Sequence, residues 1–239
     1  MSFMKNSLVV LLVLYFTACA LQTNDKSSEK SEKFAFSFSE KYIGLEKNRT
    51  FQWLGIPYAQ APVGSLRWKA PRSLENENDQ VKAIEFSNPC PQVESISIDK
   101  KGEGEFLGSE DCLFLNIFAP KNISSDKKLP VMFWIHGGGN TSGEAGSYDF
   151  SKLAAAHDLV IVSINYRLGF LGWFYHPSFA ATSNDQGDKS GNFGTLDQIM
   201  ALKWVRKNIE DFGGDKNNVT IFGESAGGHN AVSYTHLRA

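Results

Sequence analysis

The sequence predicts an α/β fold, in which strands of a largely parallel sheet alternate with helices. Three apolar runs carry this prediction, "VMFWI" at residues 131–135, "LVIVSI" at 159–164 and "VTIF" at 219–222. Such nearly continuous runs are typical of strands that are covered on both faces. A helix is predicted between the last two runs, and strand, helix and strand in succession indicate a layered α/β architecture.

The segments upstream of these runs are irregular or β-like. Residues 34–58 contain short β-like pieces around Gly44 and Gly55. Two prolines and a glycine within residues 57–64 exclude a regular helix there. The polar, glycine-bearing residues 92–109 predict a surface loop.

The predicted helix rests on an apolar repeat. Its members recur at spacings of three and four: Leu202, Val205, Ile209 and Phe212. Thr195 and Gln198 are a candidate capping box at its start, and Gly213 and Gly214 end it.

Composition indicates one globular domain and excludes one class of partner. The 239 residues are 42% hydrophobic and 13% aromatic, which is enough for a sizeable core. The formal net charge of -2 leaves no net positive field to hold nucleic acid, so we expect no nucleic-acid partner.

The N-terminus has the pattern of an export signal. Lys5 precedes an apolar run at Leu8–Phe16 that is too short for a membrane span of roughly 20 residues, so residues 1–18 are interpreted as a signal peptide. Residues 16–19, "FTAC", resemble a bacterial lipobox, in which Cys19 is lipidated and becomes the mature N-terminus. A cut after Ala20 is the alternative.

Under this interpretation the protein is exported, and it binds a membrane only through the lipid on Cys19. Residues 19–33 are almost entirely polar and would form a tether that holds the domain off a membrane, facing the periplasm or the cell exterior. Under the alternative cut the protein would be secreted or periplasmic and soluble. In either case Cys90 and Cys112 remain as an even pair that an oxidising compartment would join, with two buried free thiols as the alternative.

Two short motifs carry candidate chemistry. Gly223-Glu224-Ser225-Ala226-Gly227 follows a predicted strand, and this G-x-S-x-G pattern fits a turn so tight that it lifts the serine hydroxyl clear of the sheet. His136-Gly137-Gly138-Gly139 also follows a strand, and glycines there let backbone N–H groups approach a tetrahedral oxyanion. His136 belongs to this loop and is expected to be structural rather than a base.

Longer segments resemble one family. "FQWLGIPYAQAPVGSLRWKAP", "GSEDCLFLNIFAP", "PVMFWIHGGGNTSG", "VSINYRLGFLG" and "GNFGTLDQIMALKWVRKNIEDFGGDKNNVTIFGESAGG" are similar to the type B carboxylesterases, relatives of the cholinesterases. The resemblance covers about residues 34–233. It implies an α/β-hydrolase fold with a mixed, mostly parallel sheet and flanking helices, a small-molecule ester substrate, and no cofactor or metal.

The resemblance also implies roles for individual residues. Ser225 would be the nucleophile, the N–H groups of Gly138, Gly139 and Ala226 would form the oxyanion hole, and Glu224 would modulate the field. The remaining implied roles are structural: Cys90 and Cys112 as a disulfide, and Arg67 and Glu110 as a buried ion pair. Asn140 departs from the phenylalanine that often follows the glycines.

Part of the expected machinery is absent. In α/β-hydrolases the acid and then the histidine follow the serine, but residues 226–239 contain no Asp or Glu. His229 and His236 follow Ser225 without a downstream carboxylate to orient them. Residues 34–239 are therefore interpreted as the N-terminal half of the domain, inactive alone, and residues 234–239, "YTHLRA", are suspected to be non-native.

Two functions from different classes remain. The intact protein would be a serine hydrolase that cleaves carboxylic esters through an acyl-serine intermediate. The alternative is a non-catalytic binding or adhesion protein on the same fold. The retained serine and glycine loop favour the enzyme.

Overall fold

A computed structural model describes residues 34–35, 41–75, 80–93, 105–123 and 127–237. All of them belong to one compact unit, residues 33–239. The predictions for the signal peptide, for Cys19 and for the tether fall outside the described residues, as do residues 238 and 239 of the suspected C-terminal segment.

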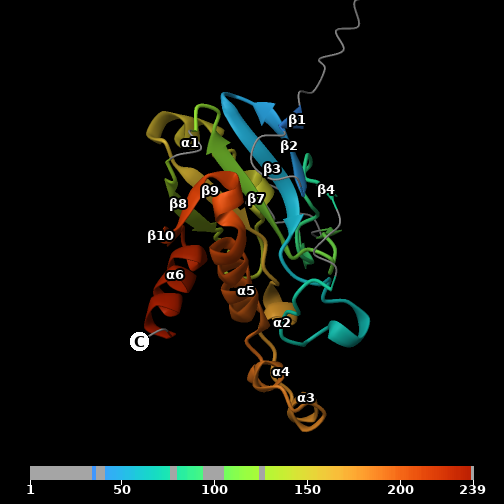
Figure 1. The fold of residues 1–239 in the computed structure, drawn as a ribbon. Coiled ribbons are helices and arrows are strands. Elements are labelled where there is room, and N and C mark those ends of the chain that lie inside the picture. Colours follow the sequence, from blue (N-terminus) through green and yellow to red (C-terminus); the bar gives the residue numbers. More distant parts are fainter. Residues whose placement is uncertain (1–33, 36–40, 76–79, 94–104, 124–126, 238–239) are drawn as a thin grey trace, which may run out of the picture. The chain divides into compact units, whose positions relative to one another are not determined.

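The core of the unit is a mixed sheet in the order β1-β2-β3-β7-β9-β8-β10, with β4 paired to β2 (Figure 1). The strands of this sheet are β1 (Phe34–Ala35), β2 (Tyr42–Lys47), β3 (Thr50–Pro57), β4 (Val81–Lys82), β7 (Phe114–Pro120), β8 (Leu129–Ile135), β9 (Val160–Ile164) and β10 (Gly214–Gly223). Strands β5 (Gln92–Val93) and β6 (Phe106–Leu107) form a separate antiparallel pair. The predicted loop at residues 92–109 thus has paired ends.

The sheet is less parallel than expected. Strands β9, β8 and β10 are parallel, as is the short β2–β4 pair, but β1–β2, β2–β3, β3–β7 and β7–β9 are antiparallel. The prediction of a mostly parallel sheet is therefore wrong for the described residues, although a mixed sheet is confirmed. An apolar run shows that a strand is covered on both faces, but it does not show the direction of its neighbours.

The three predicted core strands are confirmed as β8, β9 and β10. Their register places Ile135 of β8 opposite both Ile164 of β9 and Gly223 of β10. Since these strands are parallel, the loops that follow them leave the sheet at one edge. The glycine loop after β8 and the serine after β10 are brought together in this way.

Helices cover both faces of the sheet. The α-helices are α1 (Ser151–His157), α2 (Gly169–Gly172), α3 (Pro177–Ala181), α4 (Gln186–Ser190), α5 (Phe193–Asn208) and α6 (Ala226–Leu237), and short 3₁₀ turns are η1 (Gly64–Leu66), η2 (Ala145–Ser147) and η3 (Ile209–Phe212). Side chains of α5 and α6 pack with Val160, Val162 and Ile164 on one face, whereas α1 packs with Ile161 on the other (Figure 1). The period of two along β9 therefore separates two buried layers.

The predicted helix begins earlier and ends sooner than expected. Helix α5 starts at Phe193, and the Thr195 hydroxyl accepts a hydrogen bond from the Trp173 indole at 3.2 Å instead of capping the helix. The predicted capping box is therefore wrong. Ile209 and Phe212 are fully buried as predicted, but they lie on η3 and not on the α-helix.

Candidate active site

The serine motif forms a sharp turn between β10 and α6. Strand β10 ends at Gly223, α6 begins at Ala226, and Ser225 between them has a φ of 53°. This left-handed conformation is costly for a residue with a side chain, and such strain is found at functional sites. Ser225 is exposed.

Steric contacts explain why this turn has glycines on both sides of the serine. A Cβ added to Gly223 would lie 2.6 Å from the carbonyl oxygen of Gly227 and 2.7 Å from that of Ile135. A Cβ added to Gly227 would overlap the Ile135 carbonyl oxygen and lie 2.8 Å from that of His136. The turn packs directly on the backbone at the end of β8, so these two positions exclude side chains.

The glycine loop after β8 is tightly turned. Gly138 has a φ of 99° and Gly139 a φ of 62°, and the Gly138 carbonyl accepts hydrogen bonds from the N–H groups of Thr141 and Ser142, both at 3.0 Å. Within the described part of the chain, no backbone hydrogen bond uses the N–H of Gly138 or Gly139. Both donors are therefore free to bind a ligand.

The loop and the serine turn are in direct contact. A Cβ added to Gly137 would lie 3.2 Å from the Cβ of Ser225 and 2.9 Å from the carbonyl oxygen of Glu224. Ala226 is the first residue of α6, where backbone N–H groups have no partner within the helix and favour negative charge. The donors predicted for an oxyanion thus come from two touching segments, although their role stays a prediction.

Glu224 is exposed beside this contact. The Glu224 Oε2 atom occupies the space that a Cβ on Gly137 would need. The pKa of the Tyr148 hydroxyl is raised mainly by burial and also by the negative charge of Glu224. The carboxylate therefore acts electrostatically on its neighbours. Its modulating role in a reaction stays a prediction.

His136 has a structural environment. Its side chain is 1% exposed, and the ring stacks on Tyr166 with 4.4 Å between centroids. Burial lowers the pKa of the imidazole to about 4. The Tyr166 hydroxyl donates to the His136 carbonyl at 2.7 Å, so this pair supports the base of the glycine loop.

The other histidines are not joined to the serine. His229 and His236 are exposed on α6, and His176 accepts a hydrogen bond from the Ser178 N–H at the start of α3. None of the hydrogen bonds among the described residues links an imidazole to the Ser225 hydroxyl.

Two structural predictions have different outcomes. The Cys90–Cys112 disulfide is confirmed, and both residues are buried. Arg67 and Glu110 form two hydrogen bonds of 2.6 Å, but their side chains are 42% and 27% exposed. The prediction that this pair is buried is therefore wrong. Water screens both charges, so the pair is a surface contact.

The described residues contain a buried ion pair, Arg167 and Asp197, that the sequence did not reveal. Arg167 donates to both carboxylate oxygens of Asp197, at 2.8 Å and 2.7 Å, and the two side chains are 3% and 0% exposed. A third donor nitrogen of Arg167 binds the Lys69 carbonyl at 2.8 Å. The signal available in the sequence was one charged residue within each of two otherwise uncharged motifs, "NYRLG" and "TLDQIMAL".

An apolar hollow of about 600 Å³ has in its lining Thr141, which lies two residues after the last glycine of the loop. Thr141 and Gly169 line it together with aromatic side chains that include Trp68, Phe106 and Phe170. Phe106 is 85% and Phe170 66% exposed, so the apolar surface is open to a ligand.

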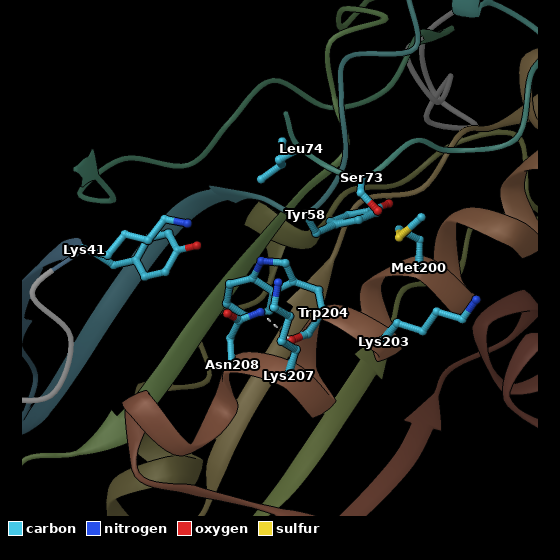
Figure 2. Close-up of a pocket in the computed structure, with 10 residues that line it drawn as sticks. Lys41, Tyr58, Ser73, Leu74, Met200, Lys203, Trp204, Lys207 and Asn208 are labelled. Atoms are coloured by element: carbon cyan, nitrogen blue, oxygen red, sulfur yellow. Dashed lines mark hydrogen bonds between the residues drawn. The ribbon is translucent and has the colours of Figure 1, made fainter. Parts of the chain in front are cut away.

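A second hollow of about 220 Å³ lies elsewhere on the domain (Figure 2). Its lining shares no residue with the glycine loop or the serine turn: Lys41, Tyr42, Tyr58, Ser73, Leu74, Met200, Lys203, Trp204, Lys207 and Asn208. Figure 2 shows Trp204 at its centre, with Lys41 and Lys203 on opposite sides. None of the predicted catalytic residues faces it.

Two features are absent from the described residues. No helix there has the length and apolar character that a bilayer crossing requires. No cluster of three or more His, Cys, Asp or Glu side chains in that part of the chain could hold a metal ion.

Comparison with known proteins gives one consistent result. Residues 40–238 match the carboxylesterase family. Para-nitrobenzyl esterase of Bacillus subtilis (strain 168) is 48% identical over 191 residues, 79% of this chain and 37% of that protein. Liver carboxylesterase B-1 of Rattus norvegicus is 37% identical over 227 residues, 91% of this chain and 39% of that protein.

A solved structure agrees with these sequences. That of a PNB esterase superposes with a TM-score of 0.68 at 43% identity, covering 84% of this chain and 39% of the other. The chain thus spans less than half the length of the relatives it matches, 37% and 39% of the two proteins above.

Proposed function

Since this chain belongs to the carboxylesterase family, we propose that the intact protein hydrolyses carboxylic esters through an acyl intermediate on Ser225. The observation that carries the proposal is the strained, exposed Ser225 packed against a glycine loop with two free N–H donors. A strained turn that holds a serine at the end of a parallel strand is the arrangement that nucleophilic attack requires.

In the first step the Ser225 hydroxyl attacks the carbonyl carbon of the ester. Its proton passes to a histidine that we expect in a part of the protein outside this chain, and the carbonyl oxygen becomes an oxyanion. The N–H groups of Gly138, Gly139 and Ala226 bind that oxygen. Each such donor contributes about 3 kcal/mol to the stability of the transition state.

The intermediate then breaks down in two stages. The alcohol leaves with the proton that the histidine returns, and Ser225 keeps the acyl group. A water molecule, deprotonated by the same histidine, attacks the acyl carbon; the bond between that carbon and the Ser225 oxygen then breaks, the histidine returns the proton to the serine oxygen, and the acid is released. These steps need only side chains, backbone N–H groups and water, so the proposal includes no cofactor.

The neighbouring hollow indicates a class of ester. Its lining by Trp68, Phe106 and Phe170 favours an ester whose acyl or alcohol part is apolar. Thr141 lines the hollow and follows Gly139 by two residues, so we place the apolar part of the substrate in the hollow while its carbonyl group meets Ser225.

A labelling experiment tests the nucleophile. A fluorophosphonate probe should label the complete gene product, and the Ser225→Ala variant should lose the label. Ser233→Ala is the matched control, because Ser233 is an exposed serine on α6 whose hydroxyl binds the His229 carbonyl, and it should be labelled like the wild type. Equal labelling of wild type and Ser225→Ala would refute the proposal.

We also propose that the protein is exported and anchored by a lipid on Cys19. The support is the lipobox-like "FTAC" after a short apolar run and before a polar tether. In a bacterial host, a fatty-acid analogue should label the wild type and fail to label Cys19→Ala. Release of both proteins in soluble, unlabelled form would support cleavage after Ala20 instead.

A further inference from the structure

The residue after the glycine loop is joined to the helix after the serine. Asn140 has a φ of 60°, a conformation that asparagine adopts more readily than most residues. Its side-chain oxygen accepts a hydrogen bond from the Asn230 amide at 2.9 Å, and its carbonyl accepts one from the Gly169 N–H at 2.7 Å. Hydrogen bonds therefore hold both the side chain and the main-chain carbonyl of Asn140.

Asn230 lies where it can orient the start of α6. It is 9% exposed and follows Ser225 by five residues on the helix that begins with Ala226. Asn140 in turn directly follows Gly139. A single hydrogen bond thus connects the segment that carries the Gly138 and Gly139 donors to the helix that carries the Ala226 donor.

The other end of the glycine loop has its own support. The buried hydroxyl of Tyr166 donates a hydrogen bond to the His136 carbonyl at 2.7 Å, at the base of the loop. The loop is therefore held at its first residue by Tyr166, and at the residue after its last glycine by Asn230.

The distance between the donors matters for the reaction. An oxyanion is stabilised only when its donors lie about 2.7–3.1 Å from the oxygen, and a misplacement of about 1 Å can lower a rate by about 100-fold. The loop and α6 come from segments 90 residues apart in sequence, so their spacing depends on contacts between them.

We propose that the Asn140–Asn230 hydrogen bond is a positioning contact that holds the glycine-loop donors and the α6 donor at the spacing an ester oxyanion requires. The inference rests on the proposed esterase function. Neither residue touches the reacting atoms, so both act through the backbone donors that they hold.

The test is a double-mutant cycle in the complete gene product. Asn140→Gly removes the side chain while allowing the positive φ, and Asn230→Ala removes the amide within a helix. Each should lower kcat for a p-nitrophenyl ester by about 10- to 100-fold, with KM changed less than about threefold. The double variant should be no slower than the slower single variant, because both changes break the same bond.

A transition-state analogue separates positioning from stability. The affinity for a trifluoromethyl ketone, which forms a tetrahedral adduct with the serine, should fall in each variant by the same factor as kcat/KM. Asn208→Ala is the matched control, since it removes an asparagine side-chain bond to the Trp204 carbonyl at 2.8 Å and should leave kcat unchanged.

The outcomes distinguish this inference from the proposed function. If the wild type is labelled by a fluorophosphonate but both asparagine variants keep wild-type kcat and melt at lower temperature, the contact is only structural and the inference fails. If the wild type neither reacts with the probe nor hydrolyses esters, the proposed function fails, and the positioning role fails with it.

Discussion

Replacement of Gly227 by alanine should damage the serine turn, whereas the same change at Gly228 should not. An added Cβ at Gly227 would lie 2.8 Å from both the His136 oxygen and the Ile135 carbonyl carbon, and it would overlap the Ile135 oxygen. At Gly228 the nearest atom outside its immediate neighbours is the Gly223 oxygen at 3.4 Å, an ordinary contact.

The size of the effect follows from these distances. The 2.8 Å contacts alone require a shift of about 0.6 Å to reach ordinary contact at 3.4 Å, the overlap with the Ile135 oxygen requires more, and all the atoms involved are backbone. Such overpacking costs about 1–3 kcal/mol. Displacement of α6 also moves Ala226 and Ser225 relative to the glycine loop, so kcat should fall by about 100-fold.

Two measurements on the complete gene product check this reasoning. The free energy of unfolding should fall by about 1–3 kcal/mol for Gly227→Ala, and it should rise by about 0.5–1 kcal/mol for Gly228→Ala because alanine favours a helix over glycine. The rate of fluorophosphonate labelling should fall only in the first variant. The same loss of stability and labelling in both variants would show that the packing on β8 is not the cause.

Three further changes have predictable results. Asp197→Ala leaves the buried Arg167 without its carboxylate and should lower the free energy of unfolding by about 3–5 kcal/mol in urea titrations, whereas the exposed Glu110→Ala should change it far less. The His136 pKa is about 4 in the folded protein and about 6.5 in the unfolded protein, so between these pH values only the unfolded state binds a proton on this imidazole. The contribution of His136 to the free energy of unfolding should therefore be greatest above pH 6.5. It should fall by about 3 kcal/mol as the pH drops to 4, and it should not change further below pH 4. A His136→Gln variant should lack this part of the pH dependence; an unchanged profile would contradict the assignment. If the apolar hollow binds the ester, Phe170→Ser should lower kcat/KM for p-nitrophenyl octanoate about tenfold and for the acetate hardly at all, and equal losses would argue against it.

Features that depend on neighbouring residues could be predicted from the sequence. The apolar runs of β8, β9 and β10 and the glycines around Ser225 are local patterns, and each of them corresponds to the expected element. Helix α5 begins at Phe193, two residues before Thr195, whose hydroxyl accepts a hydrogen bond from the Trp173 indole, and no local pattern reveals that contact.

The burial of the two ion pairs also could not be predicted from local sequence patterns. The sequence resemblance suggested the Arg67–Glu110 pairing but not its exposure, because burial depends on which segments cover a side chain. Arg167 lies in the loop between β9 and α2 and Asp197 lies on α5, 30 residues further along the chain, so their burial depends on how α5 packs against that loop.

The sequence by itself determined the strand and helix types, the serine turn and the glycine loop, since apolar periodicity and backbone freedom act over a few residues. Only the tertiary structure decided the strand order, the register that aligns Ile135 with Gly223, and the hydrogen bond between Asn140 and Asn230. These features join residues far apart in the chain, and their geometry depends on how whole elements pack together.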